Sequence, residues 1–174
     1  MPFDVPELSI QYRQAQRADI PRMAAIWAIE GNEGGTSEGR MTAYFDGQHH
    51  PQHALAPRVI YVAHEGKVMI GYIAGHLTRR FACDGELEWL YVVPQRRRSG
   101  VASGLMPCLA AWFKEQNASR VCVNVARSNT AAHSFYARHG AEPMNQYWLL
   151  WGDFAASVEK SMRSLSTRTA GDLK

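Results

Sequence analysis

The sequence is poor in cysteine, and the cysteines it has form no familiar pattern. The three are Cys83, Cys108 and Cys122, an odd number without a C-x-x-C pair. A disulfide framework or a structural zinc site is therefore disfavoured, and a reducing compartment is favoured. We expect a cytoplasmic protein.

Long apolar runs are also missing. None approaches the roughly 18 residues that a membrane-spanning helix needs. The first residues include Asp4 and Glu7 and lack the apolar stretch of a signal peptide. We expect no association with a membrane.

A strong excess of charge of one sign is absent as well. The formal net charge is +3, and 20% of the residues are charged. This balance is too weak to argue for a nucleic-acid partner, and we expect none. A local concentration of positive charge would still suit an anionic ligand.

What is present is typical of one globular domain. The chain has 174 residues and is 46% hydrophobic, which is enough for an ordinary core. We expect a single domain over 1–174 with its core at about 8–152. A leader at 1–7 and a polar tail at 156–174 are expected to be loosely ordered.

The spacing of apolar residues predicts the order of elements. Alternation and β-branched or aromatic content predict strands at 8–13, 58–64, 68–77, 86–93 and 120–126, and one or two between 144 and 151. Helical spacing predicts helices near 20–27, 38–44, 100–116 and 129–139. Hairpins in the first half and a strand–helix–strand order in the second half indicate a mixed sheet.

A run of arginines lies between a predicted strand and a predicted helix. Residues 95–99 read Q-R-R-R-S, after Pro94 and before Gly100. A helix N-terminus offers unpaired N–H groups and the positive end of its dipole, and arginines can pair with phosphate oxygens. Since Gly100 also lets the backbone approach a ligand, the order favours phosphate binding over a solvated basic turn. G-x-G-x-x-G and Walker motifs are absent, so a standard NAD or ATP site is not indicated.

Two motifs resemble those of the GNAT family of N-acetyltransferases. The family's main motif, Q/R-x-x-G-x-G/A after a strand ending V-x-P, corresponds to V-V-P at 92–94 and R-R-S-G-V-A at 97–102. A second motif, N-x-x-A-x-x-x-Y, corresponds to N-T-A-A-H-S-F-Y at 129–136. The motifs come in the family's order, separated by one helix and one strand, and the element order from Ile10 to Trp151 also looks like this fold.

The resemblance implies both a fold and an acyl donor. The fold would be α/β (α+β) and GNAT-like, with a mixed, mostly antiparallel central sheet of roughly six to seven strands and about four helices. The donor would be acetyl-CoA, with the amides from about Arg97 to Ser103 on its pyrophosphate and Asn129 on its pantetheine arm. The full implied set of donor-binding residues is Val92, Val93, Pro94, Arg97, Arg98, Ser99, Gly100, Val101, Ala102, Ser103, Gly104, Leu105 and Asn129.

The resemblance also implies direct transfer of the acetyl group to a primary amine of a small molecule. Tyr136 would be the general acid, because a phenol carries a proton at neutral pH and can donate it to the departing thiolate. A backbone N–H near Val92 would stabilise the oxyanion. No cysteine is placed for a covalent acyl intermediate. A non-catalytic acyl-CoA-binding module, and acetylation of a protein or peptide amine, are the alternatives.

The general base is assigned to Glu86 or Glu88, or to a water held by either. Glu86, Glu88, Leu90 and Val92 are expected to share one face of their strand, and a partly buried glutamate has a raised pKa. The sequence does not rank the two glutamates. Asn124 stands where the branch that acetylates protein N-termini carries a glutamate, and this disfavours that substrate class.

Polar residues near the first helix give a weaker indication of the acceptor. Glu30, Glu33 and Glu38 flank a glycine-rich break. An acidic rim there would favour a cationic amine, and a solvated loop is the alternative.

The remaining histidines are expected to have no role in the chemistry. His49, His50 and His53 lack a matching distant ligand, so we expect a loop and no metal. His76 is expected to pack on its strand. A homodimer is common among similar proteins and is a further possible partner.

Overall fold

A computed structural model of the chain describes residues 9–29 and 34–171. Its strands are β1 (Ile10–Gln14), β2 (Ala54–Glu65), β3 (Val68–Thr78), β4 (Gly85–Val92), β5 (Val121–Asn124), β6 (Glu142–Pro143) and β7 (Trp148–Trp151). Its helices are α1 (Ile20–Ile29), α2 (Gly34–Phe45), α3 (Val101–Glu115), α4 (Thr130–Arg138) and α5 (Phe154–Gly171). The predicted leader at 1–7 lies outside the described residues.

The strands form one sheet in the order β1-β2-β3-β4-β5-β7-β6. Only the β4–β5 pair is parallel, and the other neighbours are antiparallel. The parallel pair is possible because α3 forms the crossover between β4 and β5. The predicted mixed, mostly antiparallel sheet is confirmed, with one α-helix more than expected.

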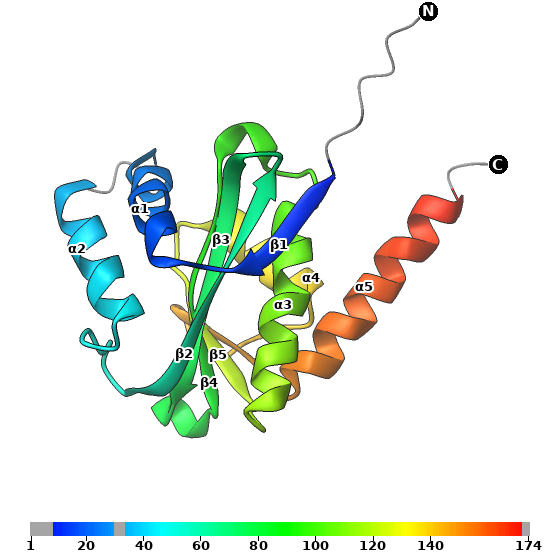
Figure 1. The fold of residues 1–174 in the computed structure, drawn as a ribbon. Coiled ribbons are helices and arrows are strands. Elements are labelled where there is room, and N and C mark those ends of the chain that lie inside the picture. Colours follow the sequence, from blue (N-terminus) through cyan, green and yellow to red (C-terminus); the bar gives the residue numbers. More distant parts are fainter. Residues whose placement is uncertain (1–8, 30–33, 172–174) are drawn as a thin grey trace, which may run out of the picture.

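Helices cover both faces of the sheet (Figure 1). α1 and α2 lie on one face and bury Met23, Met41 and Tyr44, while α3 lies on the other and buries Leu105 and Phe113. A fully buried side chain of this size contributes roughly 1.5–3 kcal/mol of stability. The two layers fix the position of β4, which lies in the middle of the sheet.

The start of β4 approaches α3 unusually closely. A Cβ on Gly85 would lie 2.3 Å from Cε1 of Phe113, whose side chain is fully buried. A side chain at this position would therefore displace the helix. Glycine at the first residue of β4 allows α3 to pack directly over the strand.

β4 and β5 stay together only at their beginnings. The register pairs Gly85 with Val121 and ends where Leu87 meets Val123. β4 continues for five more residues, to Val92, while β5 ends at Asn124. The two strands therefore part inside the sheet, and the edge of β4 beyond Leu87 borders an opening.

The prediction of a loosely ordered tail from 156 onward was wrong over the described part of that segment. α5 begins beside the C-terminal end of α3 and then diverges from it (Figure 1), and Phe154 and Val158 near its start are buried. Phe154 packs edge-on against Trp151 with ring centroids 4.8 Å apart. Ser164, Ser166 and Thr167 are exposed, and such polar residues concealed the apolar stripe in the sequence. None of the helices in the described segments is long and apolar enough to cross a membrane.

Candidate active site

Glu86 and Glu88 lie on β4 beside the opening. β3 and β4 shift register here, so that Ala74 pairs with Trp89, Gly75 pairs with Leu87, and Glu88 has no partner on β3. Such a bulge bends the strand and redirects the extra side chain. Glu86 and Glu88 still lie together, since one ligand atom from each of them and from His76 lies within 4.8 Å of the others. Val92, predicted on the same face, lies on the opposite one, because a Cβ on Gly71 would be 3.3 Å from its Cγ2 and 3.4 Å from Cγ1 of Val101 on α3.

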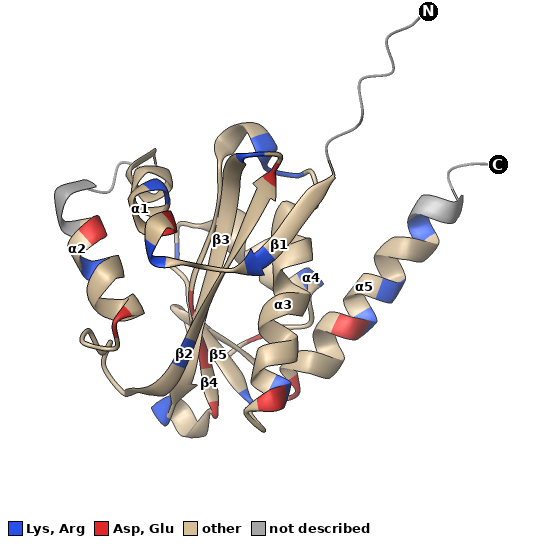
Figure 2. Cartoon of the chain, viewed as in Figure 1, with Lys and Arg blue, Asp and Glu red and all other residues tan. Residues whose placement is uncertain are grey.

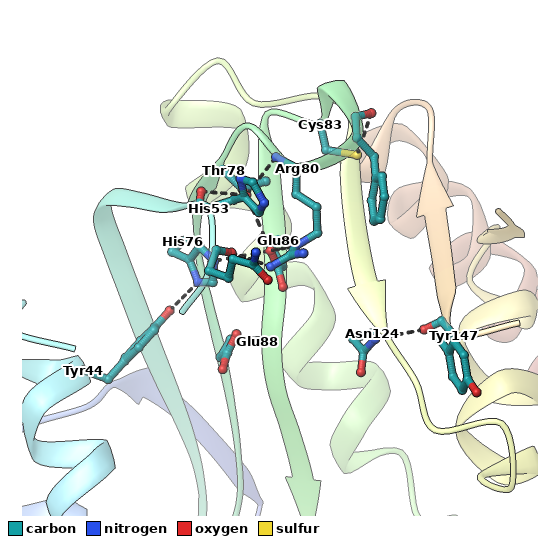
Figure 3. A network of polar contacts seen from close by, with 12 residues as sticks. Tyr44, His53, His76, Thr78, Arg80, Cys83, Glu86, Glu88, Asn124 and Tyr147 are labelled. Carbon is teal, nitrogen blue, oxygen red and sulfur yellow. Dashed lines mark hydrogen bonds and ion pairs between the residues drawn. The ribbon is translucent and has the colours of Figure 1, made fainter. Parts of the chain in front are cut away.

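Glu86 is held by several neighbours on the β3–β4 hairpin (Figure 3). Its carboxylate accepts a hydrogen bond from Nε of Arg80 at 3.2 Å and a long one from Oγ1 of Thr78 at 3.5 Å. Nε2 of His76 lies 3.6 Å from the same oxygen. Glu86 is buried, and its carboxylate is committed to an ion pair with Arg80.

Glu88 has a different environment, and Figure 3 shows it apart from the group around Glu86. Its side chain is 9% exposed, and its ion pair, to Nη2 of Arg40, is 3.3 Å long. Burial raises the pKa of the Glu88 carboxyl, and neighbouring Glu86 adds to the rise, against opposing effects from His76 and Arg40. A glutamate with a raised pKa that borders an opening is suited to accept a proton.

His76 was predicted only to pack on its strand, but it also joins this polar cluster. Its Nδ1 lies 3.0 Å from the hydroxyl of Tyr44, whose pKa burial raises well above its ordinary value. Tyr44 is therefore protonated, and its hydroxyl shares a hydrogen bond with Nδ1, so that the other ring nitrogen, Nε2, is the one on the side of Glu86. That buried Nε2 has no hydrogen-bond partner among the described residues and is directed toward Glu86.

Tyr136 reaches the opening from α4. It is buried, and its ring packs edge-on against Trp151 with centroids 5.6 Å apart. Burial raises the pKa of the phenol, so Tyr136 keeps its proton at neutral pH. Asn129, at the start of the same helix, caps it by accepting a hydrogen bond from N of Ala132 at 3.1 Å.

A pocket of about 340 Å³ joins these residues. Four of the predicted site residues line it, namely Glu86, Glu88, Asn129 and Tyr136. Asn124, which the sequence placed where some family members carry a glutamate, also lines it. Sequence reasoning missed the rest of the polar and aromatic lining, which consists of Trp27, Arg40, Trp89 and Tyr91. Trp89 and Tyr91 flank the predicted face on the same strand, but nothing in the local pattern connects Trp27 or Arg40 with β4.

The predicted phosphate loop forms the N-terminus of α3. Gly100 has φ of 85°, a left-handed conformation that favours glycine, and no side chain in the described chain caps the helix. A Cβ on Gly100 would meet no atom within 4 Å. The first amides of α3 therefore face open space and lack intrahelical partners.

The arginines of this loop differ in their contacts. Arg96 pairs with Glu65 at 2.5 Å, and Nε of Arg97 donates to the carbonyl oxygen of Val92 at 3.0 Å. The amide of Arg97 is bonded to the carbonyl of Pro94 at 3.3 Å. The amides of Arg96 and Arg97 are thus bonded within the turn, and the amides that follow them are the candidates for binding an anion.

Other members of the predicted donor-binding set belong to the core. Val92, Val93, Val101 and Leu105 are buried, so a ligand could meet only their backbone. Gly104 faces β1, since a Cβ there would lie 2.0 Å from the hydroxyl of Tyr12. The pocket beside Glu88 does not extend to these residues or to the loop.

Among the described residues, one group could offer three ligands to a metal ion, and it is His76, Glu86 and Glu88. Arg80 and Arg40 pair with the two carboxylates, and their charges oppose a divalent cation.

The other predicted candidates lie elsewhere. His50 contacts Arg58 through Nδ1 at 2.8 Å, and the carbonyl of His49 accepts from the same arginine. Glu38 is exposed on α2, while Glu30 and Glu33 lie outside the described residues. Basic residues occur on several elements, including β1, α1 and α5 (Figure 2).

Comparison with solved structures agrees with this architecture. A protein from Desulfovibrio desulfuricans assigned to the GNAT family superposes with a TM-score of 0.69 at 15% identity, over 84% of this chain and all (100%) of that one. PaiA N-acetyltransferase from Thermoplasma acidophilum, in complex with coenzyme A, gives 0.61 at 16% identity over 82% and 97%. YncA from Salmonella typhimurium, with its cofactor acetyl-CoA, gives 0.63 at 16% identity over 82% and 92%.

No curated protein matches the chain in sequence. The model of the acetyltransferase (GNAT) family, however, matches residues 23–141, which is more than half of the chain. This span includes the parted strands, both glutamates, the α3 N-terminus and Tyr136. The chain therefore belongs to the acetyltransferase (GNAT) family.

Proposed function

We propose that the protein transfers the acetyl group of acetyl-CoA to a primary amine of a small molecule. The observation that carries this proposal is the parting of β4 and β5 after Leu87 and Val123. It opens the edge of β4 between a partly buried glutamate, Glu88, and a protonated phenol, Tyr136. An acyl transfer to an amine needs a proton acceptor and a proton donor at such a point.

The residues present fit acetyl-CoA. The uncapped start of α3 offers amides and a helix dipole to a pyrophosphate, and the space in front of Gly100 is open. The edge of β4 beyond Leu87 is free of β5 and offers backbone groups to an extended amide chain. Family relatives PaiA and YncA were determined with coenzyme A and acetyl-CoA.

Acetyl-CoA, when bound, would supply the acetyl group as a thioester. Glu88 would take the proton of the attacking amine, because its carboxyl has a raised pKa while Glu86 is committed to Arg80. Tyr136 would hold a proton on its phenol and give it to the thiolate. Burial raises the pKa of the thiol of Cys122, which makes it a poor nucleophile and favours direct transfer.

Titration calorimetry with acetyl-CoA, CoA and ATP tests the proposal. We expect acetyl-CoA and CoA to bind with Kd in the micromolar range and ATP to give no heat. A screen of primary amines with a free-thiol readout then measures turnover. Failure of both CoA species to bind would overturn the assignment of the α3 N-terminus and with it the proposed function.

Replacing Tyr136 with Phe is expected to lower kcat by about tenfold or more, because a positioned acid is lost while the ring packing stays. The Kd of acetyl-CoA should change little. Tyr147→Phe is the matched control, since Tyr147 is 48% exposed and should retain full activity. Unchanged turnover in Tyr136→Phe would remove the phenol from the mechanism and leave its ring as packing.

A further inference from the structure

Arg40 lies in the pocket beside the proposed base. It comes from the middle of α2, its side chain is 45% exposed, and its Nη2 is 3.3 Å from Oε1 of Glu88. Among the described residues that line the pocket, it is the only lysine or arginine. A molecule that enters the pocket and approaches Glu88 therefore also meets a guanidinium.

Two tryptophans hold this guanidinium in place. Its central carbon lies 5.8 Å from the ring centroid of Trp27 and 5.9 Å from that of Trp89. Cation–π contacts at such distances stabilise a cation where it is, so Arg40 is positioned by three elements, α1, α2 and β4. The long ion pair with Glu88 leaves most of its five N–H donors for another anion.

The charges around the pocket favour an acceptor with two opposite charges. Glu86 is compensated by Arg80, and Glu88 faces Arg40. An ammonium group alone beside Glu88 would stand within a few ångströms of Arg40 and be repelled by it, and a second ammonium would add to the repulsion. A carboxylate near the ammonium removes this conflict, because it can form a bidentate pair with the guanidinium.

We propose that the acceptor is an amino acid, whose carboxylate binds Arg40 and whose neighbouring amine faces Glu88. The 3.3 Å between the two protein groups matches a ligand in which amine and carboxylate are separated by one or two carbons. This inference rests on the proposed function and names its acceptor class. The acidic rim predicted from the sequence would instead favour an acceptor with only positive charge, and the positive charge of Arg40 repels such an acceptor.

The test compares acceptors that differ only in the carboxylate. The purified protein is assayed with acetyl-CoA and a panel of α-amino acids and β-alanine, each paired with its amide and its decarboxylated amine. We expect the best acids to exceed their paired amides in kcat/KM by about 10- to 100-fold, as for a hydrogen-bonded charge pair.

Arg40→Gln then tests the residue. In this variant we expect the acid-to-amide ratio of kcat/KM to fall about tenfold or more, mainly through KM. Arg40→Lys should recover part of the ratio, because lysine keeps the positive charge but cannot form a bidentate pair with the carboxylate. The matched control is Arg163→Gln, since Arg163 lies on α5 with its side chain 77% exposed, and should retain the ratio. Calorimetry with acetyl-CoA is run on every variant.

Each remaining result counts against the proposal. Equal use of acids and amides, or a ratio unchanged in Arg40→Gln, overturns the acceptor class while leaving amine acetylation in place. The same holds if acetyl-CoA binds and only amines without a carboxylate are acetylated. If acetyl-CoA does not bind, the proposed function fails and the acceptor assignment fails with it.

Discussion

Replacing Glu88 with Gln is expected to lower kcat by about 100-fold or more, with the Kd of acetyl-CoA nearly unchanged. The amide has almost the shape of the carboxylate and cannot accept the amine's proton. Burial raises the pKa of the Glu88 carboxyl, and this is one reason for proposing it as the base. Steady-state rates and acetyl-CoA titrations measure the two quantities separately.

The pH profile gives an independent readout of the same residue. Glu88 acts as a base only when ionised, so kcat/KM should fall as the pH is lowered through its pKa, which lies above the ordinary value of 4.5. Glu88→Gln should lose this acidic limb. Glu159→Gln is the control, because this glutamate on α5 is 63% exposed. A variant that keeps both its rate and its acidic limb would assign the base to Glu86 or to a water.

Replacing Trp151 with Ala should reduce the free energy of unfolding by about 3–5 kcal/mol. Trp151 is fully buried, and its Nε1 donates to the carbonyl of His139 at 2.9 Å. It also contacts Phe154 and Tyr136 and so joins β7 to α4 and α5. Guanidinium chloride unfolding, followed by circular dichroism, measures the loss.

Two further substitutions separate the contributions of Trp151. Trp151→Phe keeps most of the packing and loses the hydrogen bond, so its cost should be smaller than that of Trp151→Ala. Trp148→Ala, on the same strand at a half-buried position, should also cost less. Equal losses in Trp148→Ala and Trp151→Ala would contradict the role given to Trp151 in joining the three elements.

The predictions were most reliable where one local pattern determines the structure. β3, which is buried along most of its length, appears in the sequence as a run of mostly apolar residues, and a strand followed by arginines and Gly100 is enough to indicate a helix start. The same is true of Glu86 and Glu88, whose spacing places both beside the opening. α5 was missed because its buried residues, among them Phe154 and Val158, are diluted by polar ones.

The rest of the site depends on contacts between distant segments. Glu86 and Glu88 differ in how many contacts their carboxylates make. Arg80, Arg40 and the bulge in β4 determine this difference, and no single segment contains all three. Trp27 follows an ordinary helical pattern, and its place in the pocket arises from the packing of α1 on the sheet. Tertiary packing, and not local secondary-structure propensity, therefore brings Trp27, Arg40 and Glu88 together in the pocket.

The contacts of the two glutamates also differ in how far they reach along the chain. The partners of Glu86, which are Arg80 and Thr78, lie six and eight residues away on the same hairpin. Arg40 lies 48 residues from Glu88 on a separate helix. The hairpin alone thus holds the carboxylate of Glu86, whereas changes in α2 alter the surroundings of Glu88. A change in α2 would therefore act on the proposed base and on the proposed acceptor site together, while Glu86 would keep its contacts within the hairpin.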